Sequence, residues 1–565
     1  MTDDERDEQF YRDTESVAHA QLDDRQLAML EPLGSRRKVR KGEMLFKAGQ
    51  RDVPLTVVLR GAIEVFEARE EEEQILGIAE EREFIGEVGM LTGTASLASA
   101  RGGANESEIL QVPAAALRHA LAELPGVSEM IVRAFIMRRR RLERDKEFAG
   151  LRIVSQENSR EGRQLDDFLD KNHIPHRLIA FETEHGQHLC QRLHLKSHDL
   201  PALITANGMP LRRPSLREVA RVAGLLRTPM NEEESEVFCD LAIIGAGPAG
   251  LGAAVYAASE GLKTVVLESY APGGQAGASS LIENFFGFPT GVGGGELTYN
   301  AQLQAHRFGA QFCMPSEALK LGFHEGEHGA SLQAEGCHAV IRAKCVIIAT
   351  GAQYHRLDAE GREDFEGNGV YHAATTREAR LCQGSTVIVT GAGNSAGQAA
   401  MFLSEHAAKV ILVIRGAGLS TSMSSYLSRR VEAKANIEML RHTVITKMTG
   451  GKVLQSVELE NTGSKERRTV QACAVFSMIG AKPCTDWLPP EIECDERGFI
   501  KTGHAVAGAA AWKDAGRSPG PLETSRPGIF AAGDVRSGSV KRCAAAVGEG
   551  GMAVEGVHEV LKTYA

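Results

Sequence analysis

The stretch VFCDLAIIGAGPAGLGAAVYAASEGLKTVVLES, which begins at Val237, constrains the fold of this chain more than any other. An apolar run leads into three closely spaced glycines, a helix of small residues follows, and a second apolar run starts at Lys263 and ends in an acid. This order predicts a strand-turn-helix-strand unit whose glycines let the main chain approach a pyrophosphate at the helix N-terminus, while the acid accepts ribose hydroxyls. The predicted dinucleotide-binding residues are Gly245, Gly247, Gly250 and Glu268.

A second stretch of the same kind reads STVIVTGAGNSAGQAAMFLSEHAAKVILVIRG. Its second strand ends at Ile414 and Arg415, where the first unit ends in an acid. A basic residue there can face a ribose 2′-phosphate, so we expect NADPH to be preferred over NADH. Two such units predict two bound dinucleotides. The residues assigned to this second site are Gly391, Gly393, Asn394, Ser395, Ala396 and Arg415.

Three further motifs, APGGQAGASSLIENFFGFPTGVGGGEL, VIIATGA and RPGIFAAGDVRSGSVKRCAAAVGEGGMA, complete the pattern. Together with both glycine turns they resemble the low-molecular-weight thioredoxin reductase family of FAD-dependent pyridine nucleotide oxidoreductases, from about Val237 to the end of the chain. The resemblance implies a homodimer and an FAD domain (237–356 and 486–565) that is interrupted by an NAD(P)H domain (357–485). By position, it implies that FAD is held by the first glycine turn and Glu268, with a helix starting near Cys543 that faces the pyrimidine edge of the flavin. The other residues that it places at FAD are Gly274, Gln275, Asn284 and Asp534.

The segment GVYHAATTREA, which begins at Gly369, departs from the family. Thioredoxin reductases carry a CxxC pair here that takes electrons from the flavin, whereas this chain has Ala373 and Thr376 at those positions. Neither side chain can form a thiolate or close a disulfide, and no two of the ten cysteines stand at CxxC spacing. His372 is a candidate proton donor beside the flavin, and a polar residue facing solvent is the alternative.

Three functions remain open at this point. The leading hypothesis is an FAD-dependent oxidoreductase that takes electrons from NADPH or NADH and passes them to a non-dithiol acceptor such as a quinone, a one-electron carrier or oxygen. The second is a thioredoxin-disulfide reductase that uses an atypical thiol, for which Cys543 is the candidate; the alternative for Cys543 is a small residue packed at a helix start. The third is a flavin-bearing sensor of redox state or ligand with little turnover.

The first part of the chain, residues 1–146, resembles a cyclic-nucleotide-binding domain. Short alternating runs separated by glycines predict an antiparallel β-roll over 24–112, and the apolar spacing of 113–146 predicts helix. By resemblance, Gly86 and Glu87 of FIGEVGML meet the phosphate and ribose, but the phosphate-binding arginine of the family is replaced by Ser96. Either a cyclic nucleotide still binds, or the roll is kept for contacts between domains, which we favour. The basic run MRRRRLER is predicted to be a solvated helix face.

Residues 147–226 resemble a thioredoxin or glutaredoxin module, and we call them the middle module. The predicted order is strand, helix, three strands and a final helix capped by Ser215, with Pro201 where the family carries its cis-proline. Ser155 and Ser159 lie in the loop where cysteines would open the first helix. The middle module is therefore predicted to be structural, or to dock a protein partner. Residues 227–236, RTPMNEEESE, are predicted to be an exposed linker.

Composition limits the remaining choices. At 565 residues with 43% hydrophobic side chains, the chain is too long for one core, and we predict a multidomain protein with a β-roll, a thioredoxin-like α/β module and two Rossmann-like α/β domains. The net charge of -10 gives no general attraction for nucleic acid or anionic membrane. The acidic opening MTDDERDEQF lacks the features of a secretory signal, so we expect a cytoplasmic protein without nucleic-acid, membrane or metal sites.

Overall fold

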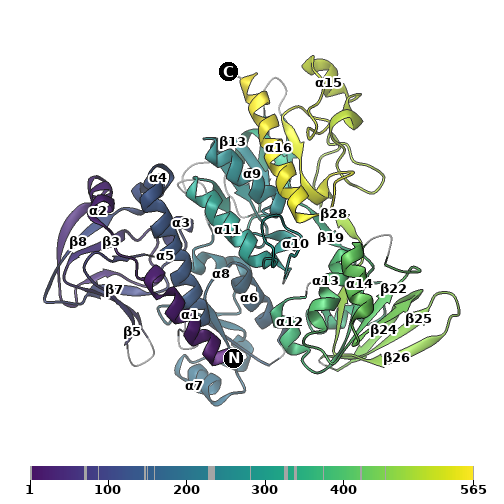
Figure 1. The fold of residues 1–565 in the computed structure, drawn as a ribbon, viewed down its shortest axis with the longest axis horizontal. Helices are drawn as coiled ribbons and strands as arrows, with labels where there is room; N and C mark the ends of the chain where they lie inside the picture. Colours follow the sequence, from purple (N-terminus) through teal and green to yellow (C-terminus); the bar gives the residue numbers. More distant parts are fainter. Residues whose placement is uncertain are drawn as a thin grey trace.

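A computed structural model describes most of the chain. It covers residues 3–68, 73–86, 88–145, 148, 150–157, 159–226, 236–279, 281–323, 329–335, 340–372, 374–419, 423–451 and 453–563. Glu87, Ala373 and nearly all of the predicted linker therefore lie outside the described residues. Four units follow one another along the chain, with the N-terminal roll and the NAD(P)H domain at opposite ends of the molecule and the FAD domain between them (Figure 1).

The N-terminal domain is the predicted roll of two four-stranded antiparallel sheets, in the orders β1-β8-β3-β6 and β2-β7-β4-β5. Helix α1 was not predicted, since its polar sequence lacks a strong apolar stripe. The prediction that the roll begins at residue 24 was wrong, because residues 24–30 form α2 and the first strand begins at Ser35. The strands are β1 (Ser35–Arg40), β2 (Met44–Phe46), β3 (Leu55–Arg60), β4 (Ile63–Ala68), β5 (Glu73–Ala79), β6 (Phe84–Ile85), β7 (Ser99–Gly102) and β8 (Glu106–Val112). The helices are α1 (Asp3–Ala18), α2 (Asp24–Leu30), α3 (Gly89–Thr92), α4 (Ala114–Glu123) and α5 (Pro125–Arg144).

The basic run at the end of α5 is not the solvated face that the sequence predicts. Arg139 is only 2% exposed and donates to the main-chain oxygen of His173 at 2.8 Å. Arg138 binds two carbonyl oxygens inside the N-terminal domain, and Arg140 pairs with Glu296 of the FAD domain at 2.9 Å. Arg139 and Arg140 thus make contacts between domains, because guanidinium groups satisfy polar oxygens that the interface removes from water.

The middle module has a four-stranded sheet in the order β10-β9-β11-β12. The peptide bond before Pro201 is cis, and Ser215 caps the last helix with a capping box, as predicted. One helix, α7, was missed; Thr183 caps it through the amide of Gly186. The likeness to thioredoxin stays a proposal, which the sheet order supports. The elements are β9 (Leu151–Ser155), α6 (Arg160–Lys171), β10 (His176–Ala180), α7 (Glu184–Arg192), β11 (Ala202–Ile204), β12 (Pro210–Arg212) and α8 (Leu216–Ala223).

The FAD domain contains a seven-stranded sheet in the order β15-β14-β13-β18-β17-β16, with β29 beside β18. Its first part holds β13 (Glu236–Ile244), α9 (Pro248–Ser259), β14 (Thr264–Leu267), α10 (Gly274–Gly277), α11 (Gly294–Arg307), β15 (Gln311–Cys313), β16 (Ala318–Gly322), β17 (Ala330–Ala334), β18 (Val340–Ile348) and β19 (Ala352–Tyr354). Its second part holds α15 (Ala510–Ala515), β29 (Ile529–Ala531) and α16 (Cys543–Lys562). Strand β28 (Ala481–Pro483) pairs with β19, where the chain passes between the two dinucleotide domains.

The NAD(P)H domain has a five-stranded parallel sheet, β20-β27-β21-β22-β23, and a separate antiparallel sheet, β24-β25-β26. The helices are α12 (Thr376–Leu381), α13 (Asn394–Leu403) and α14 (Ser425–Ala433). The strands are β20 (Val370–Tyr371), β21 (Thr386–Thr390), β22 (Lys409–Ile414), β23 (Ile437–Arg441), β24 (Thr443–Gly450), β25 (Leu454–Asn461), β26 (Arg467–Gln471) and β27 (Ala474–Ser477). Both predicted Rossmann-like units are thus confirmed as α/β domains.

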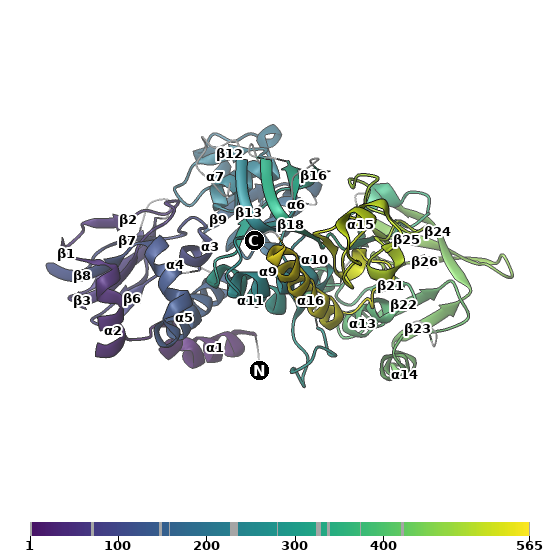
Figure 2. The same cartoon turned by 90° about the horizontal axis from the view of Figure 1, so that it is seen from above.

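The first three units share their apolar cores. One cluster joins buried residues of the middle module, such as Leu165 and Val219, to residues of the FAD domain such as Leu251. Another joins the roll to Tyr299 and Leu303 of α11. Helix α11 accordingly lies between the roll and α9 in both views (Figures 1 and 2). The NAD(P)H domain has apolar clusters of its own.

Candidate functional site

A cleft of about 660 Å³ in the FAD domain gathers most of the residues assigned to FAD. It runs from the end of β14, past the first glycine turn, to the start of α16. The predicted residues that line it are Gly245, Gly247, Glu268, Gly274, Gln275, Asn284, Asp534 and Cys543. Its donors and acceptors come from both parts of the FAD domain.

The first glycine turn has no room for side chains at two of its three glycines. Gly245 has φ +100°, which a non-glycine residue rarely adopts, and a Cβ there would lie 2.4 Å from the oxygen of Ala349. A Cβ on Gly250 would lie 1.8 Å from the oxygen of Gly245. Gly247 leaves the start of α9 uncovered, since the nearest atom to a Cβ there is 3.9 Å away. This cradle fits a pyrophosphate at the helix N-terminus.

Glu268 follows β14 at one end of the cleft. Its carboxylate accepts the amide hydrogens of Ala246 at 2.8 Å and Tyr270 at 3.0 Å. Burial raises the pKa of Glu268, and the amide donors oppose that rise. Each carboxylate oxygen has a further lone pair, so the group can still accept the ribose hydroxyls that the sequence predicts.

The opposite end of the cleft is formed by Asp534 and the first turn of α16, which begins at Cys543 as predicted. The main-chain oxygen of Asp534 accepts a hydrogen bond from Lys541 at 3.2 Å. Burial raises the pKa of the Asp534 carboxyl and raises the pKa of the Cys543 thiol to about 11. A neutral thiol at a helix start is the small packed residue weighed above, and it is no activated nucleophile.

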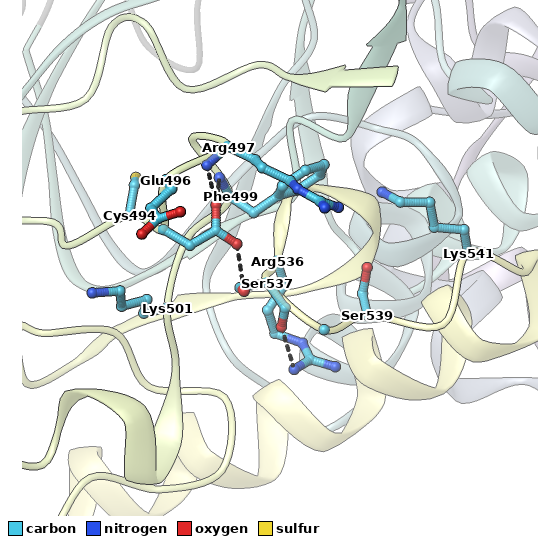
Figure 3. A pocket seen from close by; sticks show the side chains of 11 residues that line it. Cys494, Glu496, Arg497, Phe499, Lys501, Arg536, Ser537, Ser539 and Lys541 are labelled. Carbon is cyan, nitrogen blue, oxygen red and sulfur yellow. Dashed lines mark hydrogen bonds between the residues drawn. The ribbon is translucent and has the colours of Figure 1, made fainter. Parts of the chain in front are cut away.

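A second cavity, of about 780 Å³, borders this end of the cleft (Figure 3). Two of its cationic side chains are already engaged by the chain: Arg536 pairs with Glu549 at 2.5 Å, and Lys541 lies 4.3 Å from the centre of the Phe499 ring. Both residues belong to the segment that carries Asp534. The Arg536–Glu549 pair holds this segment against α16, and Lys541 holds it near Phe499. We therefore interpret the residues around this cavity as structural support for the FAD cleft.

The second glycine turn faces the same cleft. Gly393, Asn394 and Ser395 line it together with residues of the FAD domain. Gly391 has φ +139°, and a Cβ there would lie 2.4 Å from the oxygen of Met478. The Asn394 side chain accepts the amide hydrogen of Ser424 at 2.7 Å and so fixes the start of α13. The structure thus brings the two predicted dinucleotide turns to one cleft.

The other residues assigned to the second site, Gly391, Ala396 and Arg415, do not line the cleft. Ala396 is buried in the NAD(P)H domain core, and Arg415 is exposed directly after β22. An arginine at this strand end is placed to meet a 2′-phosphate.

We expect Arg415→Ala to raise KM for NADPH about tenfold and to leave KM for NADH unchanged, because a hydrogen bond to a charged group contributes about 1.5 kcal/mol or more. Steady-state rates with each nucleotide measure this. Arg467→Ala, which removes an exposed arginine of β26, serves as the control. Equal effects of Arg415→Ala on both nucleotides would contradict the assignment.

A third cavity, of about 670 Å³, lies between α6, the FAD domain and the NAD(P)H domain, and we call it the interdomain cavity. It shares Gly274, Gln275 and Ala352 with the FAD cleft, so the two spaces adjoin. His372 lines it and is about one third exposed, with its Nε2 atom 2.6 Å from Glu366. The residues from α6 are Arg160, Arg163, Gln164, Asp167 and Lys171.

Sequence reasoning missed several lining residues. Cys484 and Trp487 line the FAD cleft, and Tyr371 lines the interdomain cavity, but no motif marks them. The contribution of α6 to the interdomain cavity was missed for another reason, since no sequence motif predicts how the middle module is oriented. Its one hint is the serine-for-cysteine loop before α6, the edge that thioredoxins present to a partner.

The described part of the phosphate-binding segment of the N-terminal roll, residues 86 and 88–100, is buried. Ser96 is 5% exposed, and its hydroxyl donates to the oxygen of Ala98 at 2.8 Å. The amide of the preceding Ala95 donates to the oxygen of Ala223 in the middle module at 3.3 Å. A Cβ on Gly86 would lie 2.6 Å from the ring of Phe135.

Nearby Arg101 does not replace the missing arginine. It pairs with Glu64 at 2.8 Å, pairs with Glu73, and lies over the ring of Phe66.

We expect isothermal titration of the full chain with cAMP to give no saturable heat, because Ser96 replaces the phosphate-binding arginine and the nearby Arg118 and Arg138 already donate to the main-chain oxygens of Met90 and Gly86. Titration with NADPH checks that the same preparation is competent. Saturable binding of cAMP would show that the roll keeps its ligand.

Comparison with known proteins agrees with this geometry. Residues 239–550 match the family described as pyridine nucleotide-disulphide oxidoreductase, and residues 36–123 match the cyclic nucleotide-binding domain. The protein is therefore an FAD-dependent oxidoreductase of the thioredoxin reductase type, with a cyclic-nucleotide-binding domain at its N-terminus. The chain belongs to the pyridine nucleotide-disulphide oxidoreductase family, and its cofactors are FAD and a nicotinamide dinucleotide.

Individual relatives are similar over the second half of the chain. The thioredoxin reductase of Schizosaccharomyces pombe is 33% identical over 54% of this chain and 92% of its own length. A 34.2 kDa protein in the rubredoxin operon of Clostridium pasteurianum is 31% identical over 57% and 96%. The crystal structure of Lactococcus lactis thioredoxin reductase in its FR conformation has a TM-score of 0.51 at 26% identity, covering 57% of this chain and 99% of that one. Among the described residues, no helix has the length and apolar character needed to cross a bilayer.

Proposed function

We propose that this oxidoreductase passes electrons from NAD(P)H to a small acceptor that enters the interdomain cavity, without a dithiol that relays electrons from the flavin to the acceptor. The observation that carries the proposal is the position of this cavity, which adjoins the FAD cleft at Gln275 and Ala352. FAD, when bound, supplies the redox chemistry by taking a hydride from the nicotinamide and giving up electrons to the acceptor. The chain aligns the partners and limits what can reach the site.

The thiols of the FAD cleft do not support a dithiol route. Positions 373 and 376 are alanine and threonine, neither of which can carry electrons as a disulfide. The cleft contains Cys543 and Cys484, and burial raises the pKa of both thiols. A neutral buried thiol attacks a disulfide slowly, because the thiolate is the nucleophile.

The docking of α6 favours a small acceptor over a protein. The Tyr270 hydroxyl donates to Asp167 at 2.8 Å, and the Asn172 amide donates to the oxygen of Tyr270 at 3.2 Å. The ring of Phe168 packs edge-on against Tyr270, with the ring centres 5.3 Å apart. These contacts keep the middle module at the mouth of the cavity, where it takes the room that a docked protein would need.

Reduction and reoxidation of the flavin, followed separately, test the proposal. Anaerobic NADPH or NADH is expected to bleach the flavin absorbance of the full-length protein. A soluble quinone such as menadione is then expected to restore the absorbance, whereas oxidised thioredoxin is not. Rapid reoxidation by thioredoxin would overturn the small-acceptor proposal, and failure of both nucleotides to bleach the flavin would favour the sensor hypothesis.

A pair of variants tests whether the acceptor enters the interdomain cavity. Gln164 of α6 is exposed and lines the interdomain cavity, whereas Glu161, one turn earlier, does not line it. Gln164→Trp is expected to lower kcat/KM for menadione about tenfold, which is about 1.4 kcal/mol, while the rate of flavin reduction by NADPH stays unchanged. Glu161→Trp is expected to change neither rate. Equal effects of both variants would place the acceptor elsewhere.

A further inference from the structure

Two cysteines far apart in the sequence come together in the apolar core of the NAD(P)H domain: Cys382, which follows α12, and Cys473, which precedes β27. Their thiols lie close enough for each to shift the pKa of the other. The main chain fixes both positions. The amide of Cys473 donates to the oxygen of Thr386 at 3.1 Å, and the amide of Ser385 donates to the oxygen of Cys382 at 3.1 Å. The contact is therefore held by the turn between α12 and β21.

The surroundings of the two thiols differ. Cys382 is 1% exposed in the apolar core, whereas Cys473 is half-buried at its edge. Hydrogen bonds to the Cys473 sulfur from the Cys382 thiol and from Ser385 lower the pKa of Cys473 to about 7, and the same contact raises the pKa of Cys382. In this pair, the Cys473 thiolate is the nucleophile and the buried Cys382 is its neutral partner.

The pKa of the Cys473 thiol is lowered, unlike the pKa of the other half-buried cysteines. Burial raises the pKa of Cys484, Cys494 and Cys543, although each of them is half-buried like Cys473. Exposure alone therefore does not distinguish Cys473. The hydrogen-bond donors next to its sulfur distinguish it from the other half-buried cysteines.

We propose that Cys473 and Cys382 form a reversible dithiol-disulfide site that hydrogen peroxide oxidises. In the first step the Cys473 thiolate attacks one peroxide oxygen; the S–O bond forms, the O–O bond breaks, and the departing hydroxide takes up a proton to become water. In the second step the Cys382 sulfur attacks the Cys473 sulfenic acid; the S–S bond forms and a second water leaves. The two thiols together lose two electrons, which the peroxide gains.

A small oxidant fits the site better than a protein disulfide. Only the half-buried Cys473 is open to attack, and a mixed disulfide with a protein would need to bring a second sulfur to the buried Cys382. Peroxide needs no such approach, because the resolving thiol is already in contact with the oxidised one.

The pair also lies next to the wall of the interdomain cavity. Leu381, the residue before Cys382, lines that cavity, and so does Tyr371. Burial raises the pKa of Tyr371 to about 12, with both thiols adding to the rise, so its ring is near them. The Tyr371 ring also packs against Phe476 of β27, with the ring centres 5.4 Å apart. A bond between the sulfurs would tie the end of α12, next to Leu381, to the start of β27, and this holds whichever acceptor the enzyme uses.

The test uses the reduced full-length holoprotein and hydrogen peroxide. Intact mass is expected to fall by two hydrogen atoms, peptide mapping to give a cross-link between Cys382 and Cys473, and dithiothreitol to reverse both changes. Cys382→Ser is expected to leave a sulfenic acid on Cys473 that dimedone traps, and Cys473→Ser to give no cross-link. Cys494→Ser is expected to behave as the unaltered protein. Absence of the cross-link in the unaltered protein would overturn the proposal.

A measurement without variants covers the case in which a substitution in the core prevents folding. Iodoacetamide is expected to alkylate Cys473 of the unaltered protein about tenfold faster than Cys494 at neutral pH, because the thiolate is the reactive form. Equal rates at the two positions would contradict the assignment of Cys473 as the nucleophile.

Discussion

Gly250→Ala is expected to give a protein that folds but no longer retains FAD. The added Cβ would lie 1.8 Å from the main-chain oxygen of Gly245, and neither atom belongs to a flexible side chain. To relieve this clash, the glycine turn must move away from the start of α9. That movement separates the pyrophosphate from the helix N-terminus that binds it. The ratio of flavin to protein absorbance after purification measures the loss, and circular dichroism checks the fold.

Gly508→Ala is the matched control in the same domain. Gly508 lies outside the cleft, and a Cβ there would have no atom within 4 Å. The control is expected to retain FAD in full. If the Gly250→Ala protein retains its yellow flavin and is active with NADPH, FAD binding does not depend on this turn.

Glu523→Ala is expected to lower the stability of the FAD domain by about 1–3 kcal/mol, because two main-chain amides that donate to its buried carboxylate lose their acceptor. Glu523 is 2% exposed, and both of its oxygens lie 2.7 Å from Arg517. It also accepts the amide hydrogens of Gly520 and Gly528. The loop that it holds leads directly into β29 and Asp534, so flavin release on heating is a local report of unfolding.

Asp486→Ala breaks an exposed ion pair with Lys482 in the same region and serves as the control. Exposed pairs contribute about 0–1 kcal/mol, so the temperature of flavin release is expected to change little. Because a chain of several domains does not unfold in one step, the comparison uses flavin release and not total ellipticity. Similar shifts in both variants would mean that the Glu523 pair carries no special share of stability.

The parts of the molecule that were predictable are those with local causes. The glycine turns at Gly245 and Gly391 were found because only glycine allows both the backbone angle and the close approach of another chain segment. Ser215 was found as a helix cap because a side-chain oxygen followed by an acid three residues later satisfies the first amides of a helix. These features depend on a few neighbouring residues.

The parts that were missed depend on contacts distant in sequence. The arginines at the end of α5 look like a solvated face until the FAD domain and middle module supply their partners, such as Glu296 for Arg140. Cys382 and Cys473 meet only because β21 and β27 are neighbours in a parallel sheet. The interdomain cavity was missed because its walls come from three units whose relative orientation no single motif encodes.

The sharing of α11 between two cores has a consequence for attempts to divide the chain. Tyr299 and Leu303 lie on the FAD domain in sequence, yet they complete the apolar interior of the roll. A fragment that begins at the first glycine turn would expose this surface to water and invite self-association, even though it contains every residue assigned to both dinucleotides. The N-terminal domain thus buries an apolar surface of the catalytic half of the molecule and thereby keeps that half soluble.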